Sequence, residues 1–293
     1  MIEVSDLTYR YPGAELAAVR GVSFSVSRGE IFGLLGPSGA GKSTTQAVLT
    51  RQIRRYQGRI EVLDRELGSW DASFYERIGV GFEVPNHYLL LTGRENLTFF
   101  SSLYRRDTRA PEELLAIVGL AYAADVRVGE YSKGMQMRLG FVRAIAHDPE
   151  VLFLDEPTAG LDPVNAGVLK DLVRAERERG KTILLTTHNM TDVEELCDRV
   201  GFMVAGEMSV VDAPGALKAR YGERTVRVAY RDDGDALTQA DFPLDGLGAD
   251  ASFAELLRTR HIESLHSREA SLDRVFADVT GAPLSGAPFG GVE

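Results

Sequence analysis

Residues 36–43 read Gly36-Pro37-Ser38-Gly39-Ala40-Gly41-Lys42-Ser43 and fit the pattern G-x-x-x-x-G-K-[ST] at every fixed position. An apolar, strand-like run, Ile31 to Leu35, precedes them, and a helix-like segment, Ser43 to Thr50, follows. Glycines let the backbone wrap closely around phosphate groups, and the N-terminus of the next helix adds positive partial charge. Lys42 is placed to reach the β- and γ-phosphates, and the Ser43 hydroxyl to ligate Mg²⁺. The stretch therefore predicts a nucleotide-binding site rather than a glycine-rich turn that binds nothing.

The composition is that of an ordinary globular protein. Of the 293 residues, 44% are hydrophobic and 26% are charged, which suits one large domain with an appendage or two modest domains. No apolar run approaches the roughly 18 residues needed to cross a bilayer, and the N-terminus does not resemble a secretory signal. The single cysteine, Cys197, excludes an internal disulfide, and the net charge of −10 argues against a broad nucleic-acid footprint. We therefore expect no nucleic-acid partner and, at a membrane, action through a separate protein.

Strand-like and helix-like segments alternate around the phosphate loop. The first 30 residues read as strands and turns, which predicts an antiparallel β subdomain, and residues from about Thr92 to Asp148 have a helical pattern. Later segments alternate between the two types, which predicts a mostly parallel sheet flanked by helices, an α/β fold of the P-loop NTPase kind. The later strands are Val151–Leu154, Thr182–Thr186 and Arg199–Val204, and the later helices are Pro163–Arg179 and Thr191–Cys197.

The pattern weakens beyond about Tyr221, where we expect a small α+β extension. Thr225 to Tyr230 alternates like a strand, and two helix-like pieces follow at Ser252–Leu257 and Ser271–Val279. The last residues, from about 281 to 293, are rich in Gly, Pro and Ala and are expected to be disordered.

Two acids follow a fully apolar run, Val151 to Leu154. If this strand lies next to the strand of the phosphate loop, it carries Asp155 to the Mg²⁺ side of the site. Glu156 is then placed to polarise a water in line with the γ-phosphate. Alone, such a pair more often caps a strand or a helix, but downstream of a fitted phosphate loop it indicates catalysis.

Residues 131–136, Tyr-Ser-Lys-Gly-Met-Gln, lie upstream of that strand, where ABC transporter ATP-binding subunits carry a signature commonly written L-S-G-G-Q. The chain resembles that family: Ser132 and Gly134 match, whereas Tyr131, Lys133 and Met135 depart. The variant is similar to the one found in exporters with subunits of the daunorubicin-resistance type. The resemblance implies that Ser132, Gly134 and the following helix N-terminus bind the γ-phosphate held by an opposite subunit.

The resemblance extends over about the first 220 residues. It implies an ABC ATP-binding domain at 1–220, with a helical subdomain at about 84–148, and a C-terminal extension at 221–293. It implies that Tyr11 stacks on adenine, that Asp162 belongs to a loop crossing a dimer interface, and that His188 contacts the γ-phosphate. The phosphates of ATP would be held by Gly36, Pro37, Ser38, Gly39, Ala40, Gly41, Lys42, Ser43 and Thr44.

One position departs from the family in a way that bears on mechanism. Residues 79–85 align with a loop in which a glutamine contacts Mg²⁺ and the attacking water, but this chain has Glu83. A carboxylate still ligates Mg²⁺, yet it adds negative charge beside a triphosphate and donates no hydrogen bond while ionised. We expect Mg²⁺ ligands at Ser43, Asp155 and Glu83, with slower hydrolysis or altered coupling as a hypothesis.

The resemblance implies an ATPase that powers export of drugs or antibiotics. Its catalytic residues would be Glu156, His188 and Lys42, and its cofactors ATP and Mg²⁺. Its partners would be an integral membrane permease and a second ATP-binding subunit, identical or homologous, with the protein peripheral at the inner face of the cell membrane. Export of polysaccharide or lipid, and a soluble ABC ATPase without a transport role, remain as alternatives.

Overall fold

A computed structural model describes residues 1–222, 225–232, 234–268 and 271–282 of the chain. They form two compact units, residues 1–214 and the described residues from 215 to 282. The tail that was expected to be disordered lies outside the described residues from residue 283 onward. Among the described residues, no helix combines the length and apolar character that crossing a bilayer requires.

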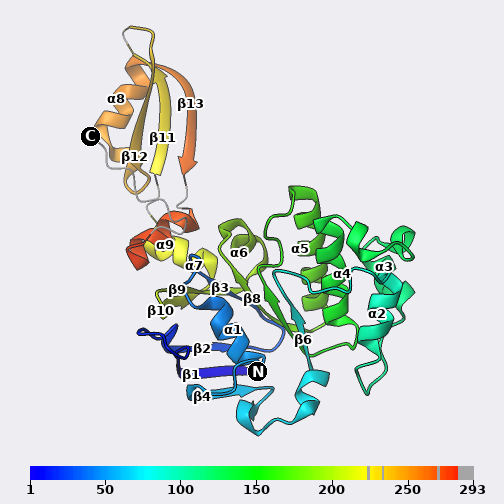
Figure 1. Cartoon of the computed structure of the whole chain (residues 1–293). Coiled ribbons are helices and arrows are strands. Elements are labelled where there is room, and N and C mark those ends of the chain that lie inside the picture. Colours follow the sequence, from blue (N-terminus) through cyan, green and yellow to red (C-terminus); the bar gives the residue numbers. More distant parts are fainter. Residues whose placement is uncertain (223–224, 233, 269–270, 283–293) are drawn as a thin grey trace. The chain divides into compact units, whose positions relative to one another are not determined.

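A six-stranded sheet forms the centre of the first unit (Figure 1). Its inner pairs are parallel and only the last pair, β9 with β10, is antiparallel. Helices cover the sheet. Helix α1 (Lys42–Leu49) packs against β7 and β8, and helix α6 (Met190–Leu196) packs against β3 and β8. The expected α/β fold is confirmed. The strand order is β10 (Glu207–Asp212), β9 (Arg199–Val204), β3 (Ile31–Leu35), β8 (Thr182–Thr187), β7 (Val151–Asp155) and β6 (Ile78–Gly81).

The order of these strands corrects one expectation. β7 is not a neighbour of β3, because β8 lies between them. Both β7 and β8 are parallel to β3, so all three strands end at the same edge of the sheet. The phosphate loop, Asp155 and His188 therefore still meet at that edge.

A second sheet, antiparallel in every pair, combines two strands that precede the phosphate loop with two that follow α1. In β2 the side chains of Val22, Phe24 and Val26 are buried while the intervening serines are more exposed, as their alternation predicts. Phe24 stacks on Phe32 of β3 with ring centroids 5.2 Å apart, so the two sheets share one hydrophobic core. The strands are, in order, β2 (Val19–Val26), β1 (Ile2–Tyr9), β4 (Gln57–Val62) and β5 (Arg65–Glu66).

The helical segment consists of α2 (Gly93–Ser101), α3 (Pro111–Ile117) and α4 (Lys133–Ile145). Thr92 and Glu95 form a capping box that fixes the start of α2, and Pro111 occupies the first turn of α3. The helical pattern expected from about Thr92 to Asp148 is interrupted, because α2 ends at Ser101 and α3 begins at Pro111. The largest remaining helix of the first unit is α5 (Pro163–Glu178). The 3₁₀ turns of the first unit are η1 (Leu67–Ser69), η2 (Ala72–Glu76), η3 (Ala121–Ala123) and η4 (Val128–Glu130).

The second unit contains a three-stranded antiparallel sheet in the order β12-β11-β13. Phe253 of α8 contacts Phe242 of β12, with ring centroids 5.3 Å apart, so this helix covers one face of the sheet. Only β11 was expected as a strand. The elements are α7 (Pro214–Tyr221), which starts at the boundary, β11 (Thr225–Arg231), β12 (Leu237–Pro243), η5 (Leu247–Ala249), α8 (Ala251–Thr259), β13 (His261–Arg268) and α9 (Leu272–Thr280).

A buried histidine makes the first unit sensitive to acid. His147 is 0% exposed, hydrogen-bonds through Nε2 to the Ile78 carbonyl oxygen at 2.8 Å, and stacks on Tyr104. Burial is the main cause that lowers the pKa of His147 to about 4, and burial likewise lowers the pKa of His87 to about 4. Both side chains are therefore neutral in the folded protein at neutral pH.

We expect the free energy of unfolding to decrease as the pH falls from about 6.5 to about 4. In this window the unfolded chain takes up protons at His147 and His87 that the folded chain does not, so stability rises with pH. His147 accounts for up to about 3 kcal/mol of this loss. The variant His147→Gln keeps an amide donor for the Ile78 carbonyl oxygen. Its free energy of unfolding, measured with urea, should differ less between pH 7 and pH 5 than that of the wild type. The same difference in variant and wild type would contradict the assignment.

Candidate nucleotide-binding site

The loop between β3 and α1 needs its glycines. Gly39 and Gly41 have φ of 80° and 101°, in the left-handed region that glycine adopts at little cost. A Cβ at Gly36 would lie 2.1 Å from the carbonyl oxygen of Met203, so no larger residue fits there. The loop thus leads directly into the N-terminus of α1, which suits an anion.

Lys42 lies inside this loop and is 6% exposed. Its Nζ donates to the carbonyl oxygens of Gly36, at 2.6 Å, and Pro37, at 3.2 Å. Burial lowers the pKa of Lys42, while the negative charges of Glu156, Asp155 and Glu83 oppose that shift. The site therefore holds a desolvated cation with several carboxylates around it.

Asp155 ends β7 and faces Ser43 at the start of α1. Its Oδ1 accepts a hydrogen bond from Ser43 Oγ at 3.1 Å and another from Thr186 Oγ1. The parallel register of β7 and β8 pairs Asp155 with Thr186, so the strand pairing itself orients the carboxylate. The hydroxyl of Ser43 and the carboxylate of Asp155 thus converge at one point.

Glu156 connects Lys42 to His188. Its backbone is left-handed, with φ of 46°, and its N–H donates to the Thr186 carbonyl oxygen at 3.1 Å. One carboxylate oxygen, Oε1, lies 3.7 Å from Lys42 Nζ, and the other, Oε2, lies 2.9 Å from His188 Nδ1. Strained backbone of this kind is found at functional sites, where the surroundings hold a side chain in one direction. The imidazole of His188 is about half exposed, so the Glu156–His188 pair is open to a ligand.

Two further predicted residues lie around this cluster. The Tyr11 hydroxyl is 3.2 Å from Thr44 Oγ1, and its ring is 45% exposed and edge-on to Tyr9. Glu83 is exposed after the end of β6, near enough for its charge to raise the pKa of Lys42. An accessible aromatic ring and a third carboxylate thus flank the loop.

Ser132, Gly134 and Asp162 form a second cluster. Ser132 caps α4 by accepting from the Met135 N–H at 3.3 Å, and Asp162 caps α5. Asn165 joins the two caps: its Nδ2 donates to Asp162 Oδ2 at 2.6 Å, and a Cβ at Gly134 would lie 2.7 Å from its Cγ. This hydrogen bond is the main cause that lowers the pKa of Asp162. In the described part of the chain, the side-chain hydrogen bonds of Ser132 and Asp162 are made to the helices that they cap.

Sequence reasoning did not identify three supporting residues. Thr186 and Asn165 look like ordinary members of a strand and a helix, yet they orient Asp155, Glu156 and Asp162. Asp192 of α6 is 2% exposed and accepts a hydrogen bond from Thr158, two residues after Glu156. A single sequence does not distinguish a buried carboxylate on a short helix, such as Asp192, from an acid on the surface.

The sequence is similar along nearly its whole length to known proteins. It is 56% identical to the fluoroquinolones export ATP-binding protein of Mycobacterium tuberculosis (strain ATCC 25618 / H37Rv) over 285 residues, which cover 97% of this chain and 95% of that protein. The family model for ABC transporters matches residues 19–159. The chain belongs to the ABC transporter family, as one of its ATP-binding subunits.

Other comparisons agree with this assignment to the ABC family. The linearmycin resistance ATP-binding protein LnrL of Bacillus subtilis (strain 168) is 37% identical over 77% of this chain and 73% of that protein. A solved ATP-binding subunit of an ABC transporter superposes with a TM-score of 0.67 and 27% identity, covering 75% of this chain and 93% of that one. The model for the fluoroquinolone efflux ABC transporter C-terminal domain matches residues 224–269 of this ABC protein.

Proposed function

We propose that this ABC ATPase powers the export of drug or antibiotic molecules through a separate membrane permease. The observation that carries the proposal is the convergence of Lys42, Asp155, Glu156 and His188 at one edge of the sheet. The similarity to the fluoroquinolones export protein supports the substrate class, because it extends over 97% of the chain. The permease, as a different chain, would select the particular substrate.

The geometry supports a separate role for each residue around ATP. Lys42 would exchange its carbonyl partners for phosphate oxygens, with the loop N–H groups beside it. Glu156 would accept a proton from the attacking water, and His188, held by the same carboxylate, would orient the γ-phosphate. Tyr11 would stack on the adenine, since its ring is exposed beside the loop.

Ser43, Asp155 and Glu83 fit Mg²⁺, because this ion prefers hydroxyl, carboxylate and phosphate oxygens. The Ser43 and Asp155 oxygens already lie 3.1 Å apart in a hydrogen bond that an ion would replace. Bound there, Mg²⁺ would neutralise charge on the β- and γ-phosphates. The protein's own contribution is the orientation of Asp155 by Thr186.

We infer that two copies, or this chain and a homologue, act together. One phosphate loop and one signature in the chain would complete two sites only when the subunits meet head to tail. Ser132, Gly134 and Asp162 would then close over the ATP that the other subunit holds. The Asn165 contact supports this role, because it places the N-terminus of α5 against that of α4.

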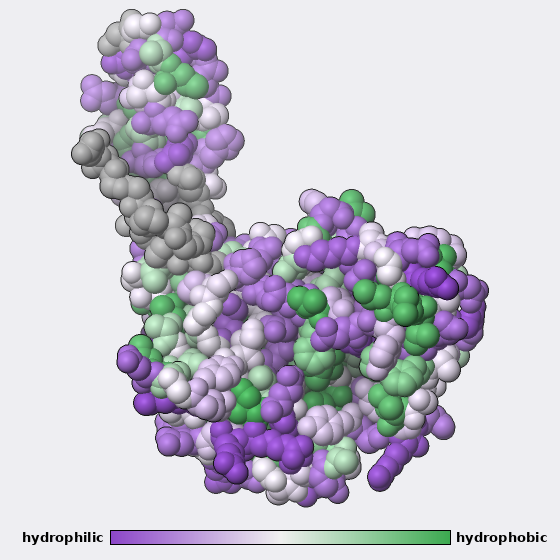
Figure 2. Space-filling view, viewed as in Figure 1, coloured by the Kyte–Doolittle hydropathy of each residue, from purple (hydrophilic) through white to green (hydrophobic). Residues whose placement is uncertain are grey.

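The helical segment would transmit the movement to the permease at the inner face of the cell membrane. Figure 2 shows apolar residues gathered over this segment, and Leu89, Leu90, Phe99 and Leu103 are exposed there. Contiguous exposed apolar surface marks sites of protein contact. Residues 1–220 would thus form the ATP-binding domain and residues 221–293 an extension.

The proposal is tested by a mild-detergent pull-down of the protein from its native membranes, followed by mass spectrometry. Recovery of a polytopic permease is the expected result, and transport assays with that permease then identify the substrate. Recovery of ribosomes or nucleic acid without a membrane protein would overturn the transport function and leave the ATPase chemistry in place.

We expect Glu83→Gln to raise the ATPase rate. The substitution removes a negative charge that acts on Lys42 and would face the triphosphate. A charge interaction of about 1 kcal/mol corresponds to about a fivefold change in rate. The exposed Glu3→Gln on β1 provides a control with the same chemistry. An unchanged rate in Glu83→Gln would remove Glu83 from the mechanism.

A further inference from the structure

A buried carboxylate on α6 lies outside the cluster around the phosphate loop. Asp192 is 2% exposed and accepts a hydrogen bond from the hydroxyl of Thr158. Lys170 of α5, the helix beside α6 in Figure 1, places its Nζ 3.7 Å from Asp192 Oδ1. Taking a carboxylate out of water costs free energy that such partners have to offset, and an apolar side chain often stabilises a fold equally well. The burial of Asp192 therefore indicates a role beyond stability.

Capping of α6 does not explain Asp192. An acid in the first turn of a helix often stabilises the helix N-terminus. In α6, however, Asn189 is the cap, and its side chain accepts from the Thr191 N–H at 3.0 Å. The carboxylate of Asp192 is directed instead to Thr158, in the turn that follows β7.

An ion pair between helices does not explain Asp192 either. Glu195, which is exposed on α6, already lies 2.7 Å from Lys170 Nζ and 3.4 Å from Arg174 Nη2. These contacts join α6 to α5 without the burial of a carboxylate. What distinguishes Asp192 from Glu195 is the hydrogen bond from Thr158.

The hydrogen bond between Thr158 and Asp192 closes a ring that contains Glu156 and His188. Thr158 follows Glu156 by two residues, and Asp192 follows His188 by four. On the other side of the ring, Glu156 Oε2 lies 2.9 Å from His188 Nδ1. The segment after β7 and the segment after β8 are thus joined at two points. The Thr158 contact therefore constrains how closely the carboxylate of Glu156 approaches the imidazole of His188.

The backbone at Glu156 depends on such constraints. Its φ of 46° is left-handed, a conformation that a non-glycine residue keeps only where its surroundings impose it. On one side, the Glu156 N–H donates to the Thr186 carbonyl oxygen at 3.1 Å, so β8 holds the chain. On the other side, the Ala159 N–H donates to the Glu156 carbonyl oxygen at 3.1 Å and closes a turn. Asp192 anchors that turn to α6 through Thr158.

We propose that Asp192 is a positioning residue for hydrolysis: acting through Thr158, it sets the distance between the Glu156 carboxylate and the His188 imidazole. The inference rests on the proposed roles of Glu156 and His188, and it adds a buried group that acts on both without contacting ATP. A misplacement of about 1 Å at a catalytic group costs about 10²-fold in rate. Loss of the Thr158 contact should therefore lower kcat, while the binding of ATP by the phosphate loop should hardly change.

Two substitutions of similar size test the hydrogen bond in the purified full-length chain. Thr158→Val keeps the shape of the side chain and removes the hydroxyl, whereas Thr158→Ser keeps the hydroxyl. We expect Thr158→Val to lower kcat about 10–10²-fold, with KM for ATP within about twofold of the wild-type value. Thr158→Ser should retain most of the wild-type rate. A folded Thr158→Val protein with the wild-type kcat, or one in which KM rises as much as kcat falls, would overturn the inference.

Asp192→Ala tests the same contact from the other side. Its kcat should also fall, and the double variant with Thr158→Val should be no slower than Asp192→Ala alone, because both changes remove one contact. Losses that multiply in the double variant would refute the pairing. The matched control is Glu195→Gln, which removes the other acid of α6 that pairs with Lys170 and should leave kcat unchanged. Equal losses of kcat in Asp192→Ala and Glu195→Gln would show that Asp192 acts only through the stability of α6.

A measurement without hydrolysis separates this inference from the proposed function. In protein labelled with ¹⁵N-histidine, the imidazole signals of His188 are assigned by their loss in His188→Asn. They should shift in Thr158→Val and Asp192→Ala and stay in place in Glu195→Gln. Signals that do not shift in the first two variants would refute the positioning role. A wild-type rate of hydrolysis in Glu156→Gln would instead overturn the proposed role of Glu156 itself.

Discussion

Glu156→Gln should reduce the rate of ATP hydrolysis about 10²–10⁴-fold, the usual contribution of a general base. Gln keeps the shape of the side chain and one oxygen acceptor, but it does not take a proton from water. The contact with Lys42 loses its charge while the phosphate loop is untouched, so ATP affinity should change little. The ATP-bound dimer should therefore accumulate with the proper partner, which size-exclusion chromatography with and without ATP measures.

The matched control is Glu178→Gln, an exposed carboxylate near the end of α5. It should hydrolyse ATP at the wild-type rate and should not accumulate a dimer. A Glu156→Gln protein that hydrolyses ATP normally would assign the proton transfer to another group. One that fails to dimerise with ATP in the presence of its partner would count against the head-to-tail arrangement.

Lys42→Met should raise the Kd for ATP about 10²-fold, because one charge-assisted hydrogen bond to a phosphate contributes about 1.5–3 kcal/mol. Met has a similar length and suits the buried position, so the loop should keep its fold. The loss should appear in the affinity for ATP, whose phosphates Lys42 would contact, more than in that for adenosine. Isothermal titration calorimetry with both ligands separates the two.

Lys181→Met is the control for this measurement. Lys181, like Lys42, is buried, but it precedes β8 and pairs with Asp148 at 2.8 Å, at the opposite end of the strand from His188. Its loss should reduce stability without changing the affinity for ATP. Equal effects of the two substitutions on ATP binding would show that Lys42 acts through the fold alone.

The phosphate loop and the strand pattern were predictable because they depend on local physics. Glycines with positive φ, a lysine at a helix start and apolar runs of strand length each leave a signal within a few residues. The position of β8 between β3 and β7 left no such signal, because strand order is decided by long-range packing. The residues proposed for the site still lie together, since parallel strands all end at one edge.

The second unit was harder to predict for a different reason. Residues 237–243 and 261–268 form β12 and β13, but both segments are polar, partly exposed and weak in apolar alternation. Their pairing with β11 and the packing of Phe253 on Phe242 determine their structure. Tertiary context therefore overrides a propensity that, read locally, favours turns.

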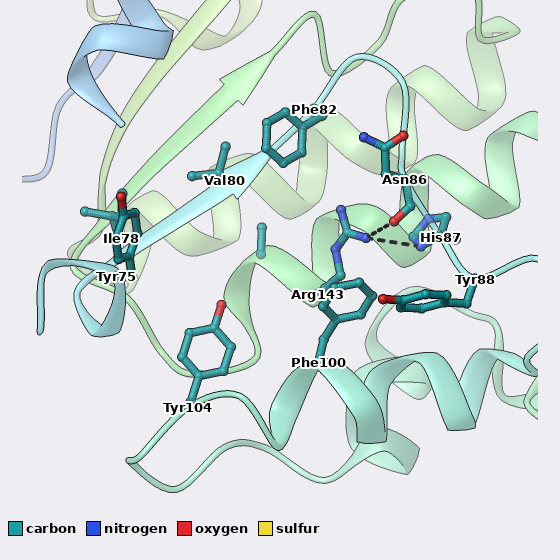
Figure 3. A pocket seen from close by; sticks show the side chains of 11 residues that line it. Tyr75, Ile78, Val80, Phe82, Asn86, His87, Tyr88, Phe100, Tyr104 and Arg143 are labelled. Atoms are coloured by element: carbon teal, nitrogen blue, oxygen red, sulfur yellow. Dashed lines mark hydrogen bonds between the residues drawn. The ribbon is translucent and has the colours of Figure 1, made fainter. Parts of the chain in front are cut away.

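The edge position of β6 has a mechanical consequence. This strand has four residues and hydrogen-bonds to a single neighbour, β7. Displacing it disrupts hydrogen bonds along one side only, so it is the strand of the parallel core that yields at the lowest free energy. The side chains of β6 line the pocket of Figure 3, which has a volume of about 530 Å³, and the end of the strand leads to Glu83. The edge of the sheet can therefore move while the centre of the sheet stays rigid around the phosphates.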